Sequence, residues 1–317
     1  MGSLNNKTVA VTGACGFIGS HLIQRLRNCE ARVLAIDSLG YGRRENLDLS
    51  DSGIQIEQLE LRNGCAGSLR ELLNGIDCVF HLAAEKHNQS INSPERVLDA
   101  NVIGTYELLK AAADAGVRKV VFTSSLYAYG RMTGPPMAED EVPNPQTVYG
   151  ISKLTGEHLC RHFFTQRGLQ TVCLRLFFVY GPRQYTGLGY RSVIVKNFER
   201  LLSGEAPLIY GDGAQRLDYV YVEDVVSALL LAMSDSGESD VFNVGSGSGV
   251  SVNELTAIMM EVADVKASCQ YGPADFTNGS SRVASTRKFD DHFGLQPRVM
   301  LRDGLRRTLE WMSASRR

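Results

Sequence analysis

Short apolar runs alternate with amphipathic stretches along the first half of the chain. Five runs rich in aliphatic and β-branched residues have the length of buried strands: 7–13, 31–37, 53–61, 77–84 and 119–125. Between them, residues 17–28 and 94–115 carry apolar side chains at helical spacing. Strands that alternate with helices in this way predict an α/β fold with a parallel, doubly wound sheet.

The second half of the chain is less regular. The pattern predicts a helix at about 149–167 and a strand at 170–180. Shorter helical pieces follow, at 190–203, 223–234, 251–263 and 301–313. We therefore expect a main domain over residues 1–177, to which segments near 219–245 return, and a smaller C-terminal lobe that comprises mainly 178–317.

A glycine-rich turn follows the first predicted strand. Gly13, Gly16 and Gly19 stand between this strand and the first predicted helix. Glycines in this context allow a tight turn and a close backbone approach, so that the helix N-terminus faces a pyrophosphate. The sequence therefore predicts a dinucleotide site, and the alternative is a purely structural glycine turn.

Asp37 bears on which dinucleotide is bound. It ends the second predicted strand, 18 positions after Gly19. A carboxylate at this place accepts hydrogen bonds from a ribose diol and repels a 2′-phosphate, which favours NAD over NADP. Arg43 and Arg44 follow soon after, and an arginine there can also bind a 2′-phosphate, which is the argument for NADP.

Composition limits the classes of partner. The chain has 317 residues, 44% of them hydrophobic, and a net charge of -2, which predicts a globular protein without an electrostatic footprint for nucleic acid or for an anionic membrane. No apolar run approaches the ~20 residues of a membrane span. The polar start "MGSLNNK" leaves no room for a signal peptide. Seven scattered cysteines without a Cys-x-x-Cys pair favour reduced thiols, and hence the cytoplasm.

The segment "VYGISK" contains candidate catalytic residues. Tyr149 and Lys153 are four positions apart at the start of a predicted helix and therefore lie on one face. A nearby ammonium, together with a positively charged nicotinamide, favours phenolate and lowers the pKa of a tyrosine. Ser124 and Ser125, at the end of the fifth predicted strand, can hydrogen-bond the same substrate oxygen. This set is suited to removing a proton from an alcohol while hydride leaves its carbon for NAD, although the spacing alone is also common on helix surfaces.

These residues resemble the extended short-chain dehydrogenase/reductase proteins, of the NAD-dependent epimerase/dehydratase group that acts on nucleotide sugars. The resemblance covers nearly the whole chain and rests on segments such as "TGACGFIGSH", "FHLAAEKH", "NVIGTYELLKAA", "YGISKLTGE", "VYGPRQ" and "FNVGSGSGVSVNEL". It implies a Rossmann-type NAD-binding domain over 1–177 and a substrate-binding lobe for a nucleotide-diphosphate sugar. It also implies a homodimer through the helices near 100–115 and 150–167.

The resemblance assigns roles to individual residues. Tyr149 resembles the catalytic acid/base, Lys153 its nicotinamide-ribose partner, and Ser125, with Ser124 beside it, the contact to the substrate hydroxyl. The residues matched to the cofactor are Gly13, Gly16, Phe17, Ile18, Gly19, Asp37, Glu60, Leu61, Leu82, Ala83, Ala84, Lys86, Asn101, Tyr149 and Lys153. Those matched to the substrate are Lys86, Ser125, Tyr127, Phe178, Arg216 and Arg282. No metal site is expected, because His158 and His162 have a spacing that zinc can use but no third ligand near them in the sequence.

The two positions after Ser125 bear on the type of reaction. Family dehydratases tend to carry an Asp-Glu pair there, since elimination needs a base and an acid, whereas this chain has Leu126 and Tyr127. A 4-epimerase needs neither, because it oxidises the 4-hydroxyl, lets the ketone rotate and returns the hydride. The resemblance therefore favours an NAD-dependent nucleotide-sugar 4-epimerase. Glu85, where dehydratases often carry a glutamate, and the Tyr127 hydroxyl leave a dehydratase or decarboxylase open, and a ketoreductase is a further alternative.

The predicted substrate lobe departs from the family pattern at two places. Phe178 stands where the family usually has an asparagine that helps to hold the diphosphate. Leu217 replaces a phosphate-binding arginine, and Arg216 stands one residue early, a shift that turns a side chain to the other face of a strand. Arg282 matches the second phosphate-binding arginine. The residues that usually hold the diphosphate are thus partly missing. A protein that binds NAD but has lost substrate binding, and is therefore catalytically silent, remains a hypothesis from a different functional class.

Overall fold

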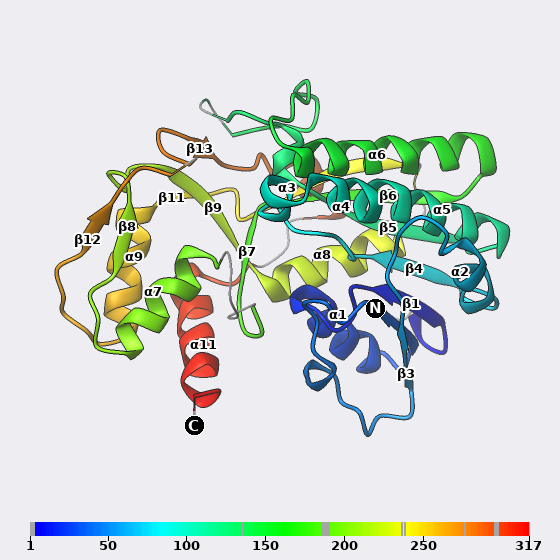
Figure 1. Ribbon diagram of the computed structural model, residues 1–317, viewed down its shortest axis with the longest axis horizontal. Coiled ribbons are helices and arrows are strands. Elements are labelled where there is room, and N and C mark those ends of the chain that lie inside the picture. Colours follow the sequence, from blue (N-terminus) through cyan, green and yellow to red (C-terminus); the bar gives the residue numbers. More distant parts are fainter. Residues whose placement is uncertain are drawn as a thin grey trace. The chain divides into compact units, whose positions relative to one another are not determined.

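The computed structural model describes residues 4–132, 134, 136–184, 191–235, 237, 239–275, 277–294 and 298–316 (Figure 1). It divides into two compact units. The first comprises Met1–Gly130, Glu141–Leu176 and Val226–Phe242, and the second comprises Arg131–Asp140, Phe177–Val225 and Asn243–Arg317. The chain therefore passes repeatedly from one unit to the other, and each unit contains segments that are distant in the sequence.

A seven-stranded sheet forms the centre of the first unit. Its strands, in order across the sheet, are β10 (Asp240–Val244), β6 (Gln170–Leu176), β5 (Lys119–Ser125), β4 (Cys78–His81), β1 (Thr8–Thr12), β2 (Arg32–Asp37) and β3 (Ile54–Gln58). The pairs from β6 through β3 are parallel. Because β2 and β4 lie on opposite sides of β1, the strand order changes direction there, which is where doubly wound folds open a ligand crevice. The predicted Rossmann-type, doubly wound parallel sheet is confirmed.

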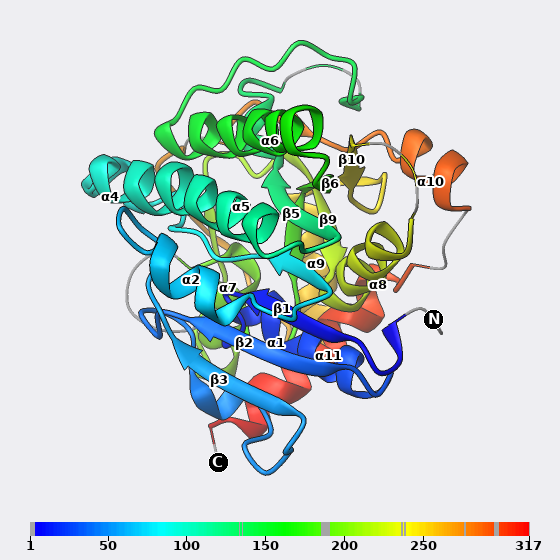
Figure 2. The same ribbon diagram turned by 90° about the vertical axis from the view of Figure 1, so that its right-hand side faces the viewer.

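Helices cover both faces of this sheet. On one face lie α2 (Ala66–Leu72), α5 (Gly104–Asp114) and α6 (Val148–Arg167), and on the other α1 (Phe17–Arg27) and α8 (Val222–Ser234) (Figures 1 and 2). Leu69, Leu108 and Phe163 from the first group pack in one core cluster with Val120 and Phe122 of β5. All seven residues of β5 are buried, as expected of a central strand in a parallel sheet that helices cover on both faces.

Two predicted elements are interrupted in the structure. The predicted helix 94–115 consists of α4 (Pro94–Leu98), a π-helical turn (Asp99–Ile103) and α5, and it follows the short helix α3 (Gln89–Asn92). The predicted strand 170–180 ends as β6 at Leu176 and resumes as β7 (Phe178–Tyr180), which pairs with β9 (Arg216–Tyr221). β7 belongs to the second unit, so the strand is divided where the chain changes unit.

Strand β9 is the centre of the second unit. It pairs with β11 (Gly249–Ser251) in antiparallel fashion, and with β7 and β13 (Ser281–Arg282) in parallel. A separate pair joins β8 (Leu208–Tyr210) and β12 (Gln270–Gly272). The remaining helices are α7 (Val193–Leu202), α9 (Val252–Val262), α10 (Arg287–Phe293) and α11 (Leu301–Ala314). Among the residues that the structure describes, in either unit, no helix is long and apolar enough to cross a bilayer.

Candidate active site and cofactor site

The glycine turn between β1 and α1 is shaped for close contacts. Gly13 has a φ of +67°, and a Cβ there would lie 2.8 Å from a backbone nitrogen of the segment after β4. A Cβ on Gly19 would lie 2.2 Å from the Gly13 carbonyl oxygen. Helix α1 opens with Phe17 and Ile18 after Gly16, and its first turn, which the structure describes in full, has no acidic residue and no capping side chain. The turn therefore fits a phosphate group held by backbone N–H groups.

Asp37 lies at the end of β2 and is fastened to this turn. Its two carboxylate oxygens accept hydrogen bonds from the backbone N–H of Cys15 (2.9 Å) and of Leu39 (2.8 Å). Burial raises the pKa of Asp37, and these two hydrogen bonds oppose that rise. The Arg43 N–H and the Asn46 side-chain amide both donate to the Cys15 carbonyl, at 3.0 and 2.9 Å. The loop after β2 therefore folds back onto the glycine turn, with Asp37 at the junction.

The segment after β4 is held beside the same turn. The Thr12 hydroxyl accepts from the N–H groups of Leu82 and Ala83, each at 3.2 Å, and Ala84 follows them. The His81 ring bonds Thr12 on one side (2.8 Å) and a threonine of α5 on the other (2.9 Å). Burial, and to a smaller extent the charge of a nearby lysine, lowers the pKa of His81 to about 3. A neutral, doubly hydrogen-bonded imidazole thus links the backbone of this segment to β1 and α5.

Asn101 projects inward from the π-helical turn and positions two other elements. Its side-chain oxygen accepts from the Glu85 N–H at 2.7 Å. Its amide nitrogen donates to the Glu85 carbonyl and to the Ser152 hydroxyl, both at 3.1 Å, and Ser152 donates to the Tyr149 carbonyl at 2.8 Å. Asn101 therefore connects the segment after β4 with the first turn of α6.

Ser125, Tyr149 and Lys153 meet where β5 ends and α6 begins. The Ser125 hydroxyl hydrogen-bonds the Tyr149 side chain, which lowers the pKa of Tyr149, but burial of the phenol dominates and raises it to about 12 although the residue keeps some accessible surface. Lys153 donates to the Thr123 carbonyl at 2.8 Å, and its ammonium lies 5.8 Å from the centre of the Tyr149 ring. Burial lowers the pKa of Lys153 to about 8, and the charge of Glu157 opposes that shift. Desolvation of the phenol is thus the dominant influence on the pKa of Tyr149 in this structure, which contains the ammonium of Lys153 but not the positively charged nicotinamide that was expected to act with it.

Ser124 faces away from this group. Its hydroxyl donates to Glu157 at 2.5 Å, and Arg175 binds the same carboxylate through two nitrogens at 2.9 and 2.8 Å. The Arg175 guanidinium also lies 4.5 Å from the centre of the Tyr129 ring. The side chains of Arg175 and Glu157 are only 4% and 5% exposed, so they form a buried ion pair behind the catalytic candidates. The structure therefore separates the two candidate serines.

His87 and Tyr127 stack beside Tyr149. The rings of His87 and Tyr127 are 4.3 Å apart between centroids, and those of Tyr127 and Tyr149 are 5.7 Å apart. His87 itself is 6.1 Å from Tyr149. The segment "FHLAAEKH" contributes to the family resemblance, but its last residue, His87, was not among the expected site residues. Its place shortly after a buried strand was the one signal that could have identified it.

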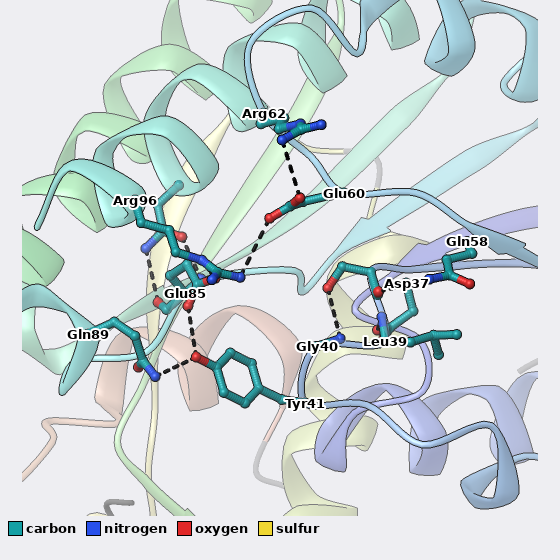
Figure 3. A network of polar contacts seen from close by, with 12 residues as sticks. Asp37, Leu39, Gly40, Tyr41, Gln58, Glu60, Arg62, Glu85, Gln89 and Arg96 are labelled. Atoms are coloured by element: carbon teal, nitrogen blue, oxygen red, sulfur yellow. Dashed lines mark hydrogen bonds and ion pairs between the residues drawn. The ribbon is translucent and has the colours of Figure 1, made fainter. Parts of the chain in front are cut away.

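Glu85 lies in a network of polar side chains (Figure 3). One of its oxygens accepts from Arg96 at 2.6 Å, and the other accepts from the Tyr41 hydroxyl at 3.3 Å. The Gln89 amide donates to the Tyr41 oxygen at 2.5 Å. Both carboxylate oxygens of the buried Glu85 are thus engaged by other side chains.

The remaining cofactor candidates adjoin this network. Glu60 forms ion pairs with Arg96 (3.5 Å) and with Arg62 (3.7 Å), as Figure 3 shows. Leu61 is buried in the core cluster under α5. The Lys86 ammonium lies 4.3 Å from the centre of the Tyr41 ring, and burial lowers the pKa of Lys86.

The other predicted substrate contacts lie in the second unit. Phe178 opens β7, and its ring centroid is 6.0 Å from that of Tyr219. Arg282, in β13, is buried, and its side chain donates to the Ser280 hydroxyl at 3.2 Å. Among the described residues, no group of three or more His, Cys, Asp or Glu side chains gathers to hold a metal ion.

Strand register separates Arg216 from Arg282. β13 runs parallel to β9 with Arg282 opposite Leu217, and adjacent residues of a strand face opposite sides. Leu217 and Arg282 are both buried, whereas Arg216 is exposed and lies 3.5 Å from Glu254. The two arginines therefore do not meet on one face of this sheet.

The chain is similar to known proteins over nearly its whole length. A family model described as "NAD dependent epimerase/dehydratase family" matches residues 9–245. A UDP-glucose 4-epimerase of Mycolicibacterium smegmatis is 35% identical over 307 residues, which cover 95% of this chain and 97% of that protein. The structure of UDP-glucose 4-epimerase from Thermotoga maritima with UDP-glucose is 34% identical, with a TM-score of 0.92, and the match covers 98% of this chain and 100% of that one. The structure of MoeE5 with UDP-glucuronic acid and NAD is 36% identical, with a TM-score of 0.86 and coverages of 97% and 99%.

Proposed function

Because this chain belongs to the NAD dependent epimerase/dehydratase family, we propose that it is a nucleotide-sugar 4-epimerase of the extended short-chain dehydrogenase/reductase type, with NAD as its cofactor. The observation that carries the proposal is the group at the end of β5. Ser125 and Tyr149 share a hydrogen bond beside Lys153, and the two positions after Ser125 are Leu126 and Tyr127 rather than carboxylates. This group suits oxidation and reduction of a hydroxyl more than elimination.

Tyr149, Ser125 and Lys153 have different roles in the proposed reaction. NAD, when bound at the glycine turn, supplies the acceptor and then the donor of the hydride at C4 of the sugar. Tyr149 removes the proton of the 4-hydroxyl and returns it to the same oxygen, which Ser125 holds by a hydrogen bond. Burial raises the pKa of Tyr149, and the positively charged nicotinamide of bound NAD, together with Lys153, would favour the phenolate against this effect.

Glu85 is unsuited to the elimination chemistry of a dehydratase. A catalytic base needs an oxygen that can reach the substrate proton, whereas both oxygens of Glu85 are engaged by Arg96 and Tyr41. A dehydratase is nevertheless the second candidate, because the imidazole of His87 and the phenol of Tyr127, which lie next to Tyr149, are groups that could serve as the base and the acid of an elimination. The contact between His87 and Tyr127 does not bear on a decarboxylase, a ketoreductase or a catalytically silent scaffold.

We also assign binding of the cofactor and binding of the substrate to two different parts of the chain. Residues 1–177, with segments near 219–245, would hold NAD, and mainly 178–317 would hold the nucleotide sugar. The buried Arg282 supports a diphosphate contact, with Phe178 and Arg216 as further candidates in the same lobe. Lys86 and Tyr127 are candidates from the first unit.

We infer a homodimer in the cytoplasm. Leu98, Ile103, Tyr106 and Ile151 are large apolar side chains that remain exposed on α4, the π-helical turn, α5 and α6 (Figure 2 shows these helices side by side). A second copy of the chain would cover them. All seven cysteines are free thiols, which supports a reducing compartment.

The first experiment identifies the reaction by its product. The purified protein is incubated with UDP-, dTDP- and GDP-sugars, including uronic acids, and each sample is followed by mass spectrometry and proton NMR. A 4-epimerase yields a stereoisomer of unchanged mass. Loss of water from the sugar would contradict the proposal and favour the second candidate, with His87 and Tyr127 as the proton carriers.

A variant then tests the catalytic assignment. Tyr149→Phe removes the hydroxyl that carries the proton, so we expect turnover to fall by about 10²- to 10⁴-fold while NAD remains bound. Tyr271→Phe, which removes an exposed hydroxyl in the second unit, serves as the matched control and should retain activity. Full activity of Tyr149→Phe would contradict the assignment.

A further inference from the structure

Tyr41 joins two loops of the first unit. It belongs to the loop after β2, and its hydroxyl donates to Glu85 at 3.3 Å and accepts from Gln89 at 2.5 Å (Figure 3). Glu85 follows β4, and Gln89 opens α3. The Lys86 ammonium lies 4.3 Å above the ring, so the side chain is held at its end and on its face. Tyr41, Glu85 and Gln89 are called the Tyr41 bridge below.

We propose that the Tyr41 bridge closes over bound NAD and retains it, which makes Tyr41 a cofactor-retaining residue. The inference rests on the proposed function. An enzyme that oxidises and then reduces the same sugar must keep its cofactor between the two hydride transfers, because loss of the reduced cofactor would leave a ketone. A side-chain bridge that slows release of NAD meets that need.

The order of the strands places the bridge over the cofactor site. β1 lies between β4 and β2, and these strands are parallel, so their carboxyl ends share one edge of the sheet. The glycine turn leaves the end of β1, the Tyr41 loop leaves β2, and the Glu85 segment leaves β4. A contact between the two outer loops must therefore cross the end of the middle strand. That end is where the glycine turn presents its N–H groups to a pyrophosphate.

Both ends of the bridge are anchored independently of each other. Glu85 is fixed by Arg96 through its side chain and by Asn101 through its backbone. The Tyr41 loop is fixed to the glycine turn by hydrogen bonds to the backbone of Cys15. Because each anchor persists when the bridge opens, opening costs only the contacts of Tyr41 itself. The bridge can therefore open to admit NAD without unfolding either loop.

The test measures release of NAD rather than turnover. The protein is loaded with isotopically labelled NAD and then mixed with excess unlabelled NAD, and the label that stays with the protein is followed over time by rapid gel filtration. Tyr41→Phe removes the hydroxyl and keeps the ring, and it should release NAD roughly tenfold faster, since two hydrogen bonds that close the bridge are lost. Tyr271→Phe is the matched control, because its hydroxyl also donates one hydrogen bond of 3.3 Å to a side chain.

The outcomes separate this inference from the proposed function. Faster release by Tyr41→Phe, with wild-type release by Tyr271→Phe, supports the Tyr41 bridge. Equal release by all three proteins, or equally fast release by both variants, overturns the inference alone. Failure of the wild-type protein to bind NAD at all overturns the proposed function and the bridge with it. If Tyr41→Phe does not fold, Gln89→Met tests the same bridge from its other side, with the same expected acceleration and the same contrary result.

Discussion

Neighbouring residues of one strand have different surroundings in this protein. Ser124 and Ser125 are adjacent, and both were candidates for holding the substrate oxygen. In the structure Ser125 meets Tyr149 in the first turn of α6, whereas Ser124 binds Glu157, which lies further along the same helix. The sequence could place hydroxyls at the strand end, but it could not say which of them meets Tyr149 and which meets Glu157.

His81 makes the stability of the protein depend on pH. Burial keeps the folded-state pKa of His81 at about 3, whereas an unfolded histidine titrates near its reference pKa of about 6.5. Between these two values the unfolded chain binds a proton that the folded chain does not. The free energy of unfolding should therefore fall as the pH falls through this window, by up to about 1.4 kcal/mol per pH unit from this group, and the contribution should be constant above the window.

Urea unfolding between pH 4.5 and 7.5, to be measured on wild-type protein and His81→Gln, checks this expectation. In the variant, the slope of the free energy of unfolding against pH should be smaller, by an amount that corresponds to about one bound proton. His292→Gln, at an exposed position of α10 in the second unit, is the matched control and should keep the wild-type slope. An unchanged slope in His81→Gln would show that other groups cause the acid sensitivity.

At the scale of elements, the interruption of one helix matters most for the site. The apolar spacing over 94–115 predicted a continuous helix, but a π-helical turn at Asp99–Ile103 divides it. Such turns are rare and often accompany function. Here the turn carries Asn101, which holds both the Glu85 segment and the start of α6. Spacing in the sequence does not reveal this turn, because the hydrogen bonds that stabilise it are made with residues distant along the chain.

Asn101→Ala should therefore destabilise two elements at once. The substitution leaves the Glu85 N–H without its partner, and an unsatisfied buried donor costs about 1–3 kcal/mol. We expect a loss of that size in the free energy of unfolding and weaker binding of NAD, measured by urea titration and by calorimetry. Asn74→Ala, at an exposed turn, should change stability by less than about 0.5 kcal/mol. If Asn101→Ala matched this control, the positioning role of Asn101 would be refuted.

At the scale of the whole molecule, the proposed homodimer follows from apolar side chains left at the surface. Leu98, Ile103, Tyr106 and Ile151 stay exposed on helices of the first unit. An unpaired charge buried in such an interface is costly. Ile103→Lys should therefore weaken self-association by roughly 30- to 1,000-fold, given the ~2–4 kcal/mol that such a buried charge costs.

Size-exclusion chromatography with light scattering at micromolar concentration measures this effect. Val142→Lys, on an exposed loop segment of the same unit, adds the same charge elsewhere and should leave the dimer intact. A wild-type monomer, or an Ile103→Lys variant that is still dimeric, would argue against this face as the interface.

The sequence by itself determined the fold class and the family, because their signals are local. The glycine turn with Asp37 and the four-residue spacing of Tyr149 and Lys153 each depend on one turn or one strand end. The alternation of apolar runs with stretches of helical spacing was enough to predict the parallel sheet, since each buried strand and each covering helix shows its own pattern in its own segment of the sequence.

Only the tertiary structure decided how the candidate residues are used. Glu85 could act as a base until Tyr41, 44 positions away, and Arg96 were seen to engage its two oxygens. The pKa of Tyr149 depends on burial of the phenol and on the hydroxyl of Ser125, which belongs to another element. These properties arise from contacts between chain segments that are far apart in the sequence, and such contacts exist only when the strands have taken their order in the sheet.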